Sequence, residues 1–319
     1  MSERSAHQRV ASTNLSKSAA YRPHEGKLAI ITGGSRGIGA AIARNLAAKG
    51  CSLLLVYTSD SSTGPIQALC EDLISAYDIR CIPVQADLSD PTRSAPYIVS
   101  SARNHFAHPV TGKFQIDFLI NNAGIAGDKL LNDPDKGPIE ETQFDRIYKV
   151  NVLAPLLLTQ ACAPSLPNDR SGRIVNVSSV SSSIGHEGQS IYAGTKGALE
   201  AMTRTWSREL ADRCTVNAVN PGPVWGDMYA NTGPKFWKVN QTYSETAPLT
   251  KYVDNDEVRS MVGKDAEAFR KVVEESMGGR RPGFTEEVAG VIGMLCSEES
   301  GWTTGSVICA NGGMKMSIA

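Results

Sequence analysis

Residues 178–196 read SSVSSSIGHEGQSIYAGTK and contain the most informative spacing in the chain. Tyr192 and Lys196 are four residues apart, so on a helix both side chains point the same way, about one turn apart. Ser179 lies 13 residues before Tyr192 (192 − 179 = 13) and follows residues 173–177, an apolar run typical of a buried strand. The sequence therefore predicts a hydroxyl at the carboxyl end of a strand, beside a helix that carries a phenol and an ammonium.

This arrangement has a chemical meaning as well as a structural one. An ammonium beside a phenol stabilises the phenolate, so we expect Lys196 to lower the pKa of Tyr192 from its usual value of about 10. Tyr192 would then act as a proton donor or acceptor, and Ser179 would hydrogen-bond a substrate oxygen. A Tyr-x-x-x-Lys pair alone is more often an ordinary helix surface pair, so the interpretation depends on the rest of the chain.

A glycine-rich turn near the amino end supports the interpretation. Residues 28–39 read LAIITGGSRGIG and predict a strand, a turn and the start of a helix that continues over residues 40–49. Glycines let backbone amides approach a pyrophosphate, and the amino end of a helix adds a favourable dipole. The expected phosphate-binding residues are Gly33, Ser35, Arg36, Gly37, Ile38 and Gly39.

Taken together, these motifs resemble those of the short-chain dehydrogenase/reductase family. The residues that carry the resemblance follow the family's order and are Thr32–Gly39, Asp87, Asn121–Gly124, Asn151, Ser179, Tyr192, Lys196 and Asn220–Gly222. The resemblance implies an α/β fold, a doubly wound Rossmann domain over residues 27–319 with a parallel sheet of about seven strands. The further cofactor contacts that it implies are Asp87, Leu88, Asn122, Ala123, Gly124, Tyr192, Lys196, Pro221, Gly222 and Val224.

The end of the second strand, expected over residues 50–57, bears on the choice of cofactor. A carboxylate there commonly grips the ribose 2′-hydroxyl of NAD and would repel a 2′-phosphate. The chain has Tyr57, Thr58 and Ser59 at this place, which offer hydroxyls and no charge, while Arg36 can reach the same phosphate. Asp60 is the alternative NAD ligand, but it lies beyond the expected end of the strand. We therefore predict NADP(H).

Asn151 is an amide within the apolar helix expected over residues 142–165. An amide in such a place is costly unless it is hydrogen-bonded. The resemblance makes Asn151 a fourth catalytic residue, whose backbone kink binds a water that continues the proton path from Lys196 to solvent. The alternative is a core amide that is simply satisfied by its neighbours.

The bulk composition fits a soluble enzyme of small molecules. The chain has 319 residues, of which 41% are hydrophobic, and a formal net charge of −1, so we expect no nucleic-acid or membrane partner. Its apolar runs are far shorter than the roughly 20 residues of a membrane helix. The seven cysteines are odd in number and scattered, without metal-ligand spacing. We therefore expect reduced thiols, a cytoplasmic location and no metal site.

Residues 1–26 differ from the rest in being rich in Ser, Ala, Arg and Lys without apolar periodicity. We expect a flexible arm, or one that drapes over a partner subunit, in preference to a transit peptide, because Glu3 and Glu25 and the lack of an amphipathic stripe weaken the second interpretation. In the family, the helix that follows Tyr192 pairs between subunits. The resemblance therefore implies a homodimer or homotetramer.

Residues 226–283 form a long insertion that we expect to cover the substrate as a loop, with one charged helix near residues 265–275. Its aromatic residues include Phe236 and Trp237, which favour a bulky, partly planar substrate, or alternatively only anchor the insertion to the core. The expected substrate contacts are His186, Trp225, Phe236 and Trp237.

The insertion also departs from the family at its first residue. Many relatives have a threonine at the place of Gly226, where its hydroxyl meets the nicotinamide carboxamide. Either the backbone at Val224 is enough here, or Asp227 compensates.

The predicted function is reversible reduction of a ketone to an alcohol with hydride from NADPH. Tyr192 protonates the oxygen, Ser179 orients it, Lys196 tunes Tyr192 and Asn151 supports the proton relay. Because cells keep NADPH mostly reduced, reduction is the expected direction. Two alternatives remain open at this point. One is a related enzyme that reduces imines, dehydrates or cyclises its substrate, and the other is a non-catalytic protein that senses NADP(H).

Overall fold

The computed structural model describes residues 21–316, apart from the side chain of Asp227. Most of the arm expected over residues 1–26, and the proposed transit or draping role of residues 1–20, lie outside the described residues. Seven parallel strands form one sheet in the order β3-β2-β1-β4-β7-β8-β9. The strands are β1 (Leu28–Thr32), β2 (Ser52–Tyr57), β3 (Cys81–Gln85), β4 (Phe118–Asn121), β7 (Gly172–Val177), β8 (Cys214–Pro221) and β9 (Val307–Ala310). The predicted doubly wound fold is confirmed.

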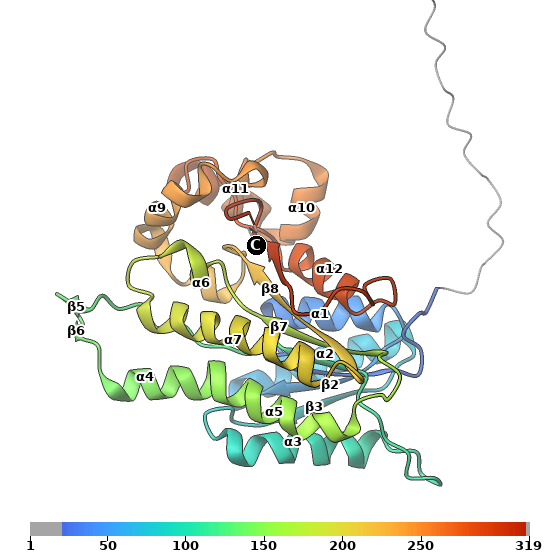
Figure 1. Ribbon diagram of the computed structural model, residues 1–319. Coiled ribbons are helices and arrows are strands. Elements are labelled where there is room, and N and C mark those ends of the chain that lie inside the picture. Colours follow the sequence, from blue (N-terminus) through green and yellow to red (C-terminus); the bar gives the residue numbers. More distant parts are fainter. Residues whose placement is uncertain (1–20, 317–319) are drawn as a thin grey trace, which may run out of the picture.

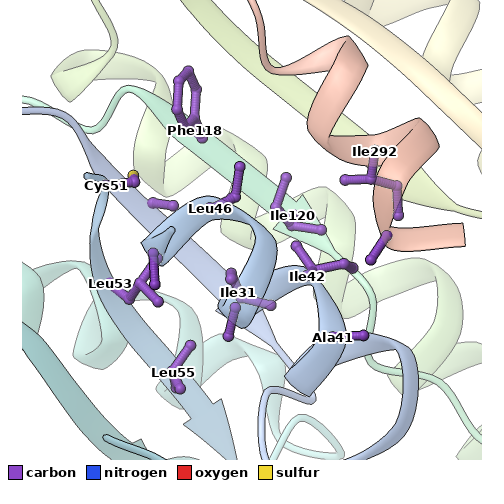
Figure 2. Packing of buried hydrophobic residues seen from close by; sticks show 14 of the residues in the cluster. Ile31, Ala41, Ile42, Leu46, Cys51, Leu53, Leu55, Phe118, Ile120 and Ile292 are labelled. Atoms are coloured by element: carbon purple, nitrogen blue, oxygen red, sulfur yellow. The ribbon is translucent and has the colours of Figure 1, made fainter. Parts of the chain in front are cut away.

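Helices cover both faces of the sheet, as an all-parallel sheet requires. Side chains of β1 alternate between the faces, and Figure 2 shows Ile31 packed with Ile42, Leu46 and Ile292 on one of them. The helices on this face are α1 (Gly37–Ala47), α2 (Thr63–Tyr77) and α12 (Thr285–Leu295). The opposite face carries α3 (Pro91–Phe106), α5 (Ala154–Cys162) and α7 (Ser190–Glu209). The central strands β1, β4, β7 and β8 are therefore buried on both sides, and the site has a rigid base.

The strand order reverses next to β1. From β1 the chain winds outward through β2 to β3, and then crosses back by α3 to β4 on the other side of β1. Parallel sheets bind ligands outside the carboxyl ends of the strands at such a switch point. The turn after β1 and the residues after β4, β7 and β8 all reach this edge.

The helix expected over residues 142–165 is interrupted in the structure. It consists of α4 (Glu141–Tyr148), a π-helical turn η2 (Lys149–Leu153), α5 and a 3₁₀ turn η3 (Ala163–Ser165). Pro155 has no N–H, so it cannot donate the regular helical bond to the carbonyl of Asn151. The widened turn at Asn151 has this physical cause, and it provides the backbone kink that the family resemblance implies.

Residues 226–283, which we call the lid, are more helical than expected. They contain α8 (Asp227–Ala230), α9 (Gly233–Ser244), α10 (Asp256–Val262) and α11 (Ala266–Ser276). Figure 1 shows α9, α10 and α11 gathered at one end of the sheet, close to α6 (Ser181–Ile184). A separate apolar cluster fills the lid and consists of Trp237, Val258, Phe269, Val273, Met277 and Phe284. At its base, Trp225 N donates to Gly283 O (2.8 Å) and Gly283 N donates to Pro223 O (2.9 Å).

Between β4 and α4 the chain forms only the two-residue strands β5 (Asn132–Asp133) and β6 (Gly137–Pro138). Between residues 21 and 316, no helix has the length and apolar character needed to cross a bilayer.

The expected boundary between arm and domain at residue 26 is wrong, because residues 22–26 pack against the domain. Arg22 donates to the carbonyl of Asp78 (3.2 Å) and His24 is only 1% exposed. The His24 ring lies edge-on against Phe118, with 5.0 Å between ring centroids, and neither of its nitrogens has a hydrogen-bond partner. Apolar contact of the His24 ring and hydrogen bonds to backbone carbonyls anchor these residues, and the polar composition of the segment gives no sign of either.

Burial lowers the pKa of His24 from 6.5 to about 4, assisted by the positive charges of Lys27 and Lys49. Between these values the unfolded chain binds a proton that the folded chain does not, so stability falls as the pH drops from 6.5 toward 4. The expected loss is at most about 3 kcal/mol. Urea unfolding of wild type and His24→Phe at pH 7.5 and 4.5 measures it.

His24→Phe should lose this part of the pH dependence, whereas His105→Phe, a change at an exposed position of α3, should retain it. Equal acid sensitivity in the two variants would show that His24 does not cause the effect.

Candidate active site

A cavity of about 1310 Å³ lies along the carboxyl edge of the sheet. The predicted cofactor residues line it, including the glycine turn, the end of β2 and the segments after β3, β4 and β8. Those that line the cavity are Gly33, Ser35, Arg36, Gly37, Ile38, Gly39, Tyr57, Thr58, Ser59, Asp87, Leu88, Asn122, Ala123, Gly124, Pro221, Gly222 and Val224. Ser179, Tyr192 and Lys196 line the same cavity, so one space joins the two anchors of the sequence.

Glycines let the backbone of the turn between β1 and α1 lie very close to neighbouring groups. A Cβ added at Gly39 would overlap the carbonyl oxygen of Gly33 and lie 2.8 Å from Asn122 Nδ2. Gly37 has φ +56°, in the left-handed region that favours glycine. The first turn of α1 contains no acidic residue. The cradle and the helix dipole therefore fit a pyrophosphate group.

Asn122 braces this turn from the neighbouring strand. Its Nδ2 donates to the carbonyl of Thr32 (2.8 Å), and its backbone N–H donates to the Thr32 hydroxyl (3.0 Å). The residue expected to line the cofactor ribose thus also fixes the shape of the glycine turn. Asp87 similarly accepts from both the backbone N–H and the hydroxyl of Ser89 while it lines the cavity.

The end of β2 presents hydroxyls to the cavity. Ser59 and Ser62 line it and lie 3.0 Å apart, Oγ to Oγ. The Asp60 carboxylate instead accepts from Gln85 Nε2 (2.6 Å), and Asp60 is not part of the cavity wall. The carboxylate considered as an NAD ligand is therefore not part of the cavity wall.

Tyr192, Lys196 and Ser179 converge as the spacing predicts. Ser179 Oγ donates to Ser181 Oγ (3.1 Å) and lies beside the Tyr192 phenol. Lys196 Nζ lies 5.5 Å from the centroid of the Tyr192 ring and donates to the carbonyl of Val177 (2.8 Å). Gly124 keeps this corner open, because a Cβ there would be 3.4 Å from Lys196 Nζ.

The predicted lowering of the Tyr192 pKa is wrong. Burial raises the pKa of Tyr192 to about 12, although the neighbouring Ser179 hydroxyl opposes the change. Burial also lowers the pKa of Lys196 to about 8. Burial thus favours the neutral form of both groups, so the phenol carries its proton at neutral pH. Tyr192 is thus set as a proton donor.

The Asn151 side chain is a satisfied core amide. It accepts from the backbone N–H of Ile125 (2.9 Å) and donates to the Ile125 carbonyl (2.9 Å) and the Thr195 hydroxyl (3.1 Å). Asn151 does not line the cavity. The side chain fixes the segment after β4 against α7, which leaves only the backbone of the π-helical turn for the relay expected from the sequence.

Three of the four expected substrate residues line the cavity, namely His186, Trp225 and Phe236. Trp237 does not, and this expectation is wrong. Its side chain is 8% exposed, belongs to the apolar cluster of the lid and donates from Nε1 to the carbonyl of Tyr229 (3.1 Å). For Trp237 the alternative of an anchor within the lid is the correct one.

Sequence reasoning missed a polar part of the wall, which includes Asp128, Gln189, Asn231 and Asn240. Gln189 Nε2 donates to Asp128 Oδ1 (3.0 Å), and Gln189 Oε1 is buried without a partner. Gln189 could have been found, since it lies three residues before Tyr192 and falls on the same side of the helix. Asn231 lies in the turn between α8 and α9, and Asn240 lies on α9, a lid helix that had no clear signal in the sequence.

These features match the results of comparison with known proteins. The family profile for short chain dehydrogenase matches residues 27–236. The chain belongs to the short-chain dehydrogenase family. It is 61% identical to an L-xylo-3-hexulose reductase of Hypocrea jecorina, over 93% of this chain and 99% of the relative. It is 60% identical to an L-xylulose reductase of Aspergillus niger, over 92% and 99%.

Solved structures agree with the family assignment. A blue fluorescent protein from a metagenomic library, crystallised in complex with NADPH, aligns with a TM-score of 0.73 and 30% identity. The alignment covers 92% of this chain and all of that protein. The protein is therefore an oxidoreductase with the short-chain dehydrogenase fold over nearly its whole length.

This short-chain dehydrogenase has an open position at Gly226. No atom lies closer than 4.0 Å to a Cβ placed there, and the nearest is Thr285 Cγ2 at that distance. Both Thr285 and Val224 line the cavity. Two alternatives were considered for the missing threonine. Val224 lines the cavity, so its backbone is within reach of it. The side chain of Asp227 lies outside what the structure describes.

Proposed function

We propose that this oxidoreductase reduces the keto group of a ketose or similar polyhydroxy ketone, with NADPH as the hydride donor. The observation that carries the proposal is one cavity that is lined by Ser179, Tyr192 and Lys196 and also has a polar wall. The sugar reductases found among the relatives support the same reaction class.

Each residue of the site has its own role in carbonyl reduction. NADPH, when bound, supplies the hydride that the carbonyl carbon accepts. Ser179 donates a hydrogen bond to the carbonyl oxygen, and Tyr192 transfers its phenolic proton to that oxygen. The ammonium of Lys196 stabilises the phenolate that remains. We assign to the kinked backbone at Asn151 a supporting role in returning a proton to this site.

The end of β2 supports NADPH over NADH. The hydroxyls of Thr58, Ser59 and Ser62 and the nearby Arg36 can receive a 2′-phosphate. A carboxylate would repel it, and Asp60 is held by Gln85 away from the cavity. The structural neighbour that binds NADPH supports this choice.

The polar wall supports a hydroxylated substrate. Asp128 accepts hydrogen bonds, and the amides of Gln189, Asn231 and Asn240 both donate and accept them. A site built around buried polar groups rejects an analogue that leaves those groups unpaired. The proposed substrate therefore differs from the bulky planar molecule that the aromatic residues of the lid suggested, some of which fill the lid interior instead.

The test is a panel of ketones with purified protein, followed by NADPH oxidation at 340 nm. L-Xylulose and other ketoses should have kcat/KM values about 100-fold above those of apolar ketones such as cyclohexanone. NADH should support the reaction poorly with every substrate. A preference for apolar ketones would overturn the substrate class, and NADPH binding without turnover of any ketone would favour the sensing protein.

We also propose a cytoplasmic location and a homo-oligomer. None of the seven cysteines, all of which the structure describes, is in a disulfide, which fits a reducing compartment.

Large apolar side chains are exposed on helices and near β9, among them Phe144 and Leu153 and, most fully, Trp302 at 98%. Association between copies would cover them. Sedimentation equilibrium at the mass of a single chain would contradict this proposal.

A further inference from the structure

A single carboxylate oxygen gathers three hydrogen bonds behind the reacting groups. Glu200 lies on α7, four residues after Lys196 (200 − 196 = 4). Its Oε1 accepts from the hydroxyls of Ser178 (2.7 Å) and Ser182 (2.7 Å) and from Asn220 Nδ2 (3.1 Å). Hydrogen bonds to an ionised acceptor are roughly twice as strong as neutral ones, so this oxygen is a strong tether.

The three donors come from the two segments that complete the active site. Ser178 directly precedes Ser179 in the connection from β7 to α6, and Ser182 lies in α6. Asn220 is near the end of β8, directly before Pro221 and Gly222 of the cavity wall, and it also donates to the Ser179 carbonyl (2.9 Å). Glu200 thus ties the helix that carries Tyr192 to the segment that carries Ser179.

The same carboxylate acts on the charge of Lys196. It is the group whose negative charge favours the ammonium, against the desolvation that lowers the pKa of Lys196 to about 8. Ser178 Oγ, besides donating to Glu200, is 3.4 Å from the Lys196 carbonyl. Asp128, the other carboxylate on this side of the cavity, acts on Tyr192 and raises its pKa.

We propose that Glu200 is a positioning residue for carbonyl reduction, which holds Ser179 in register with Tyr192 and keeps Lys196 positively charged. The inference rests on the proposed function, since it concerns the same reaction. Glu200 itself does not line the cavity, so it acts through its neighbours and not on the substrate.

Two substitutions distinguish the effect of the hydrogen bonds that Glu200 accepts from the effect of its negative charge. Glu200→Gln retains an amide oxygen that can accept from the same three donors, but removes the negative charge. Glu200→Ala removes both. Glu209→Gln, an exposed position on the same helix, removes an equal charge at a distance and is the matched control.

Glu200→Ala should lower kcat about 10- to 100-fold, because a small displacement of a reacting group has a large effect on rate. The KM for NADPH should stay within about twofold, since the glycine turn is not involved. Glu200→Gln should keep most of the rate at pH 7. The alkaline limb of its kcat–pH profile should lie at lower pH than in wild type. The reason is that the Lys196 ammonium no longer has the negative charge of Glu200 to stabilise it.

Hydrogen–deuterium exchange gives a reading that does not depend on turnover. Peptides covering residues 178–184 should exchange faster in Glu200→Ala than in Glu209→Gln, with equal exchange in β1. This result would support the tether even if wild type reduced no ketone, an outcome that would overturn only the proposed function. Unchanged exchange in Glu200→Ala, or unchanged kcat and pH profiles in both Glu200 variants of an active enzyme, would overturn the role of Glu200.

Discussion

Replacing Tyr192 by phenylalanine is expected to lower kcat/KM for ketone reduction by a factor of about 10²–10⁴, the usual contribution of a positioned general acid. The substitution removes the proton that the carbonyl oxygen needs, while the ring still fills its place on α7. The affinity for NADPH should change little, because the glycine turn and the end of β2 are untouched. Steady-state kinetics with a ketose and a fluorescence titration with NADPH measure the two quantities.

Tyr97→Phe provides the control, since it makes the same chemical change at an exposed position on α3. It should keep wild-type kinetics. If Tyr192→Phe retained more than about a tenth of the wild-type kcat/KM, another group would have to be the proton donor, contrary to the role assigned from the general-acid argument.

Gly39→Ala is expected to weaken NADPH binding by at least about 100-fold and to destabilise the fold by about 1–3 kcal/mol, as overpacking commonly does. A Cβ at this position would overlap the Gly33 carbonyl and press against the Asn122 amide, so the turn between β1 and α1 could not keep its shape. Since the same turn is expected to cradle the pyrophosphate, its distortion should remove the binding site directly. Isothermal titration calorimetry and urea unfolding measure the two effects.

Gly64→Ala is the comparison for this result. Gly64 lies on α2, and an added Cβ there would meet no atom within 4 Å. Alanine should leave NADPH binding unchanged and stabilise the helix by up to about 1 kcal/mol. Tight NADPH binding by Gly39→Ala would mean that the turn is not the phosphate site.

The fold and the cofactor side could be predicted because their signals are local. A strand, a glycine turn and a helix appear in order within residues 28–49, and most of the predicted cofactor residues lie at or just after the carboxyl end of a strand. The positions of Tyr192 and Lys196 relative to each other depend only on helix geometry. The position of Ser179 could be predicted because this residue follows the end of β7, which lies beside α7.

Other features depend on tertiary contacts that spacing does not encode. The raised pKa of Tyr192 comes from burial, and the position of Trp237 from packing among lid helices. The tether at Glu200 joins residues from α7, the segment after β7 and β8. The widened turn at Asn151 had a readable cause in Pro155, but a proline near a helix start is equally compatible with a regular helix.

The base of the lid has a consequence for catalytic turnover. The chain enters and leaves the lid side by side, joined by two backbone hydrogen bonds between Pro223–Trp225 and Gly283, and the lid has its own apolar interior. We expect such a unit to move as one body when substrate enters and product leaves, with its helices kept intact.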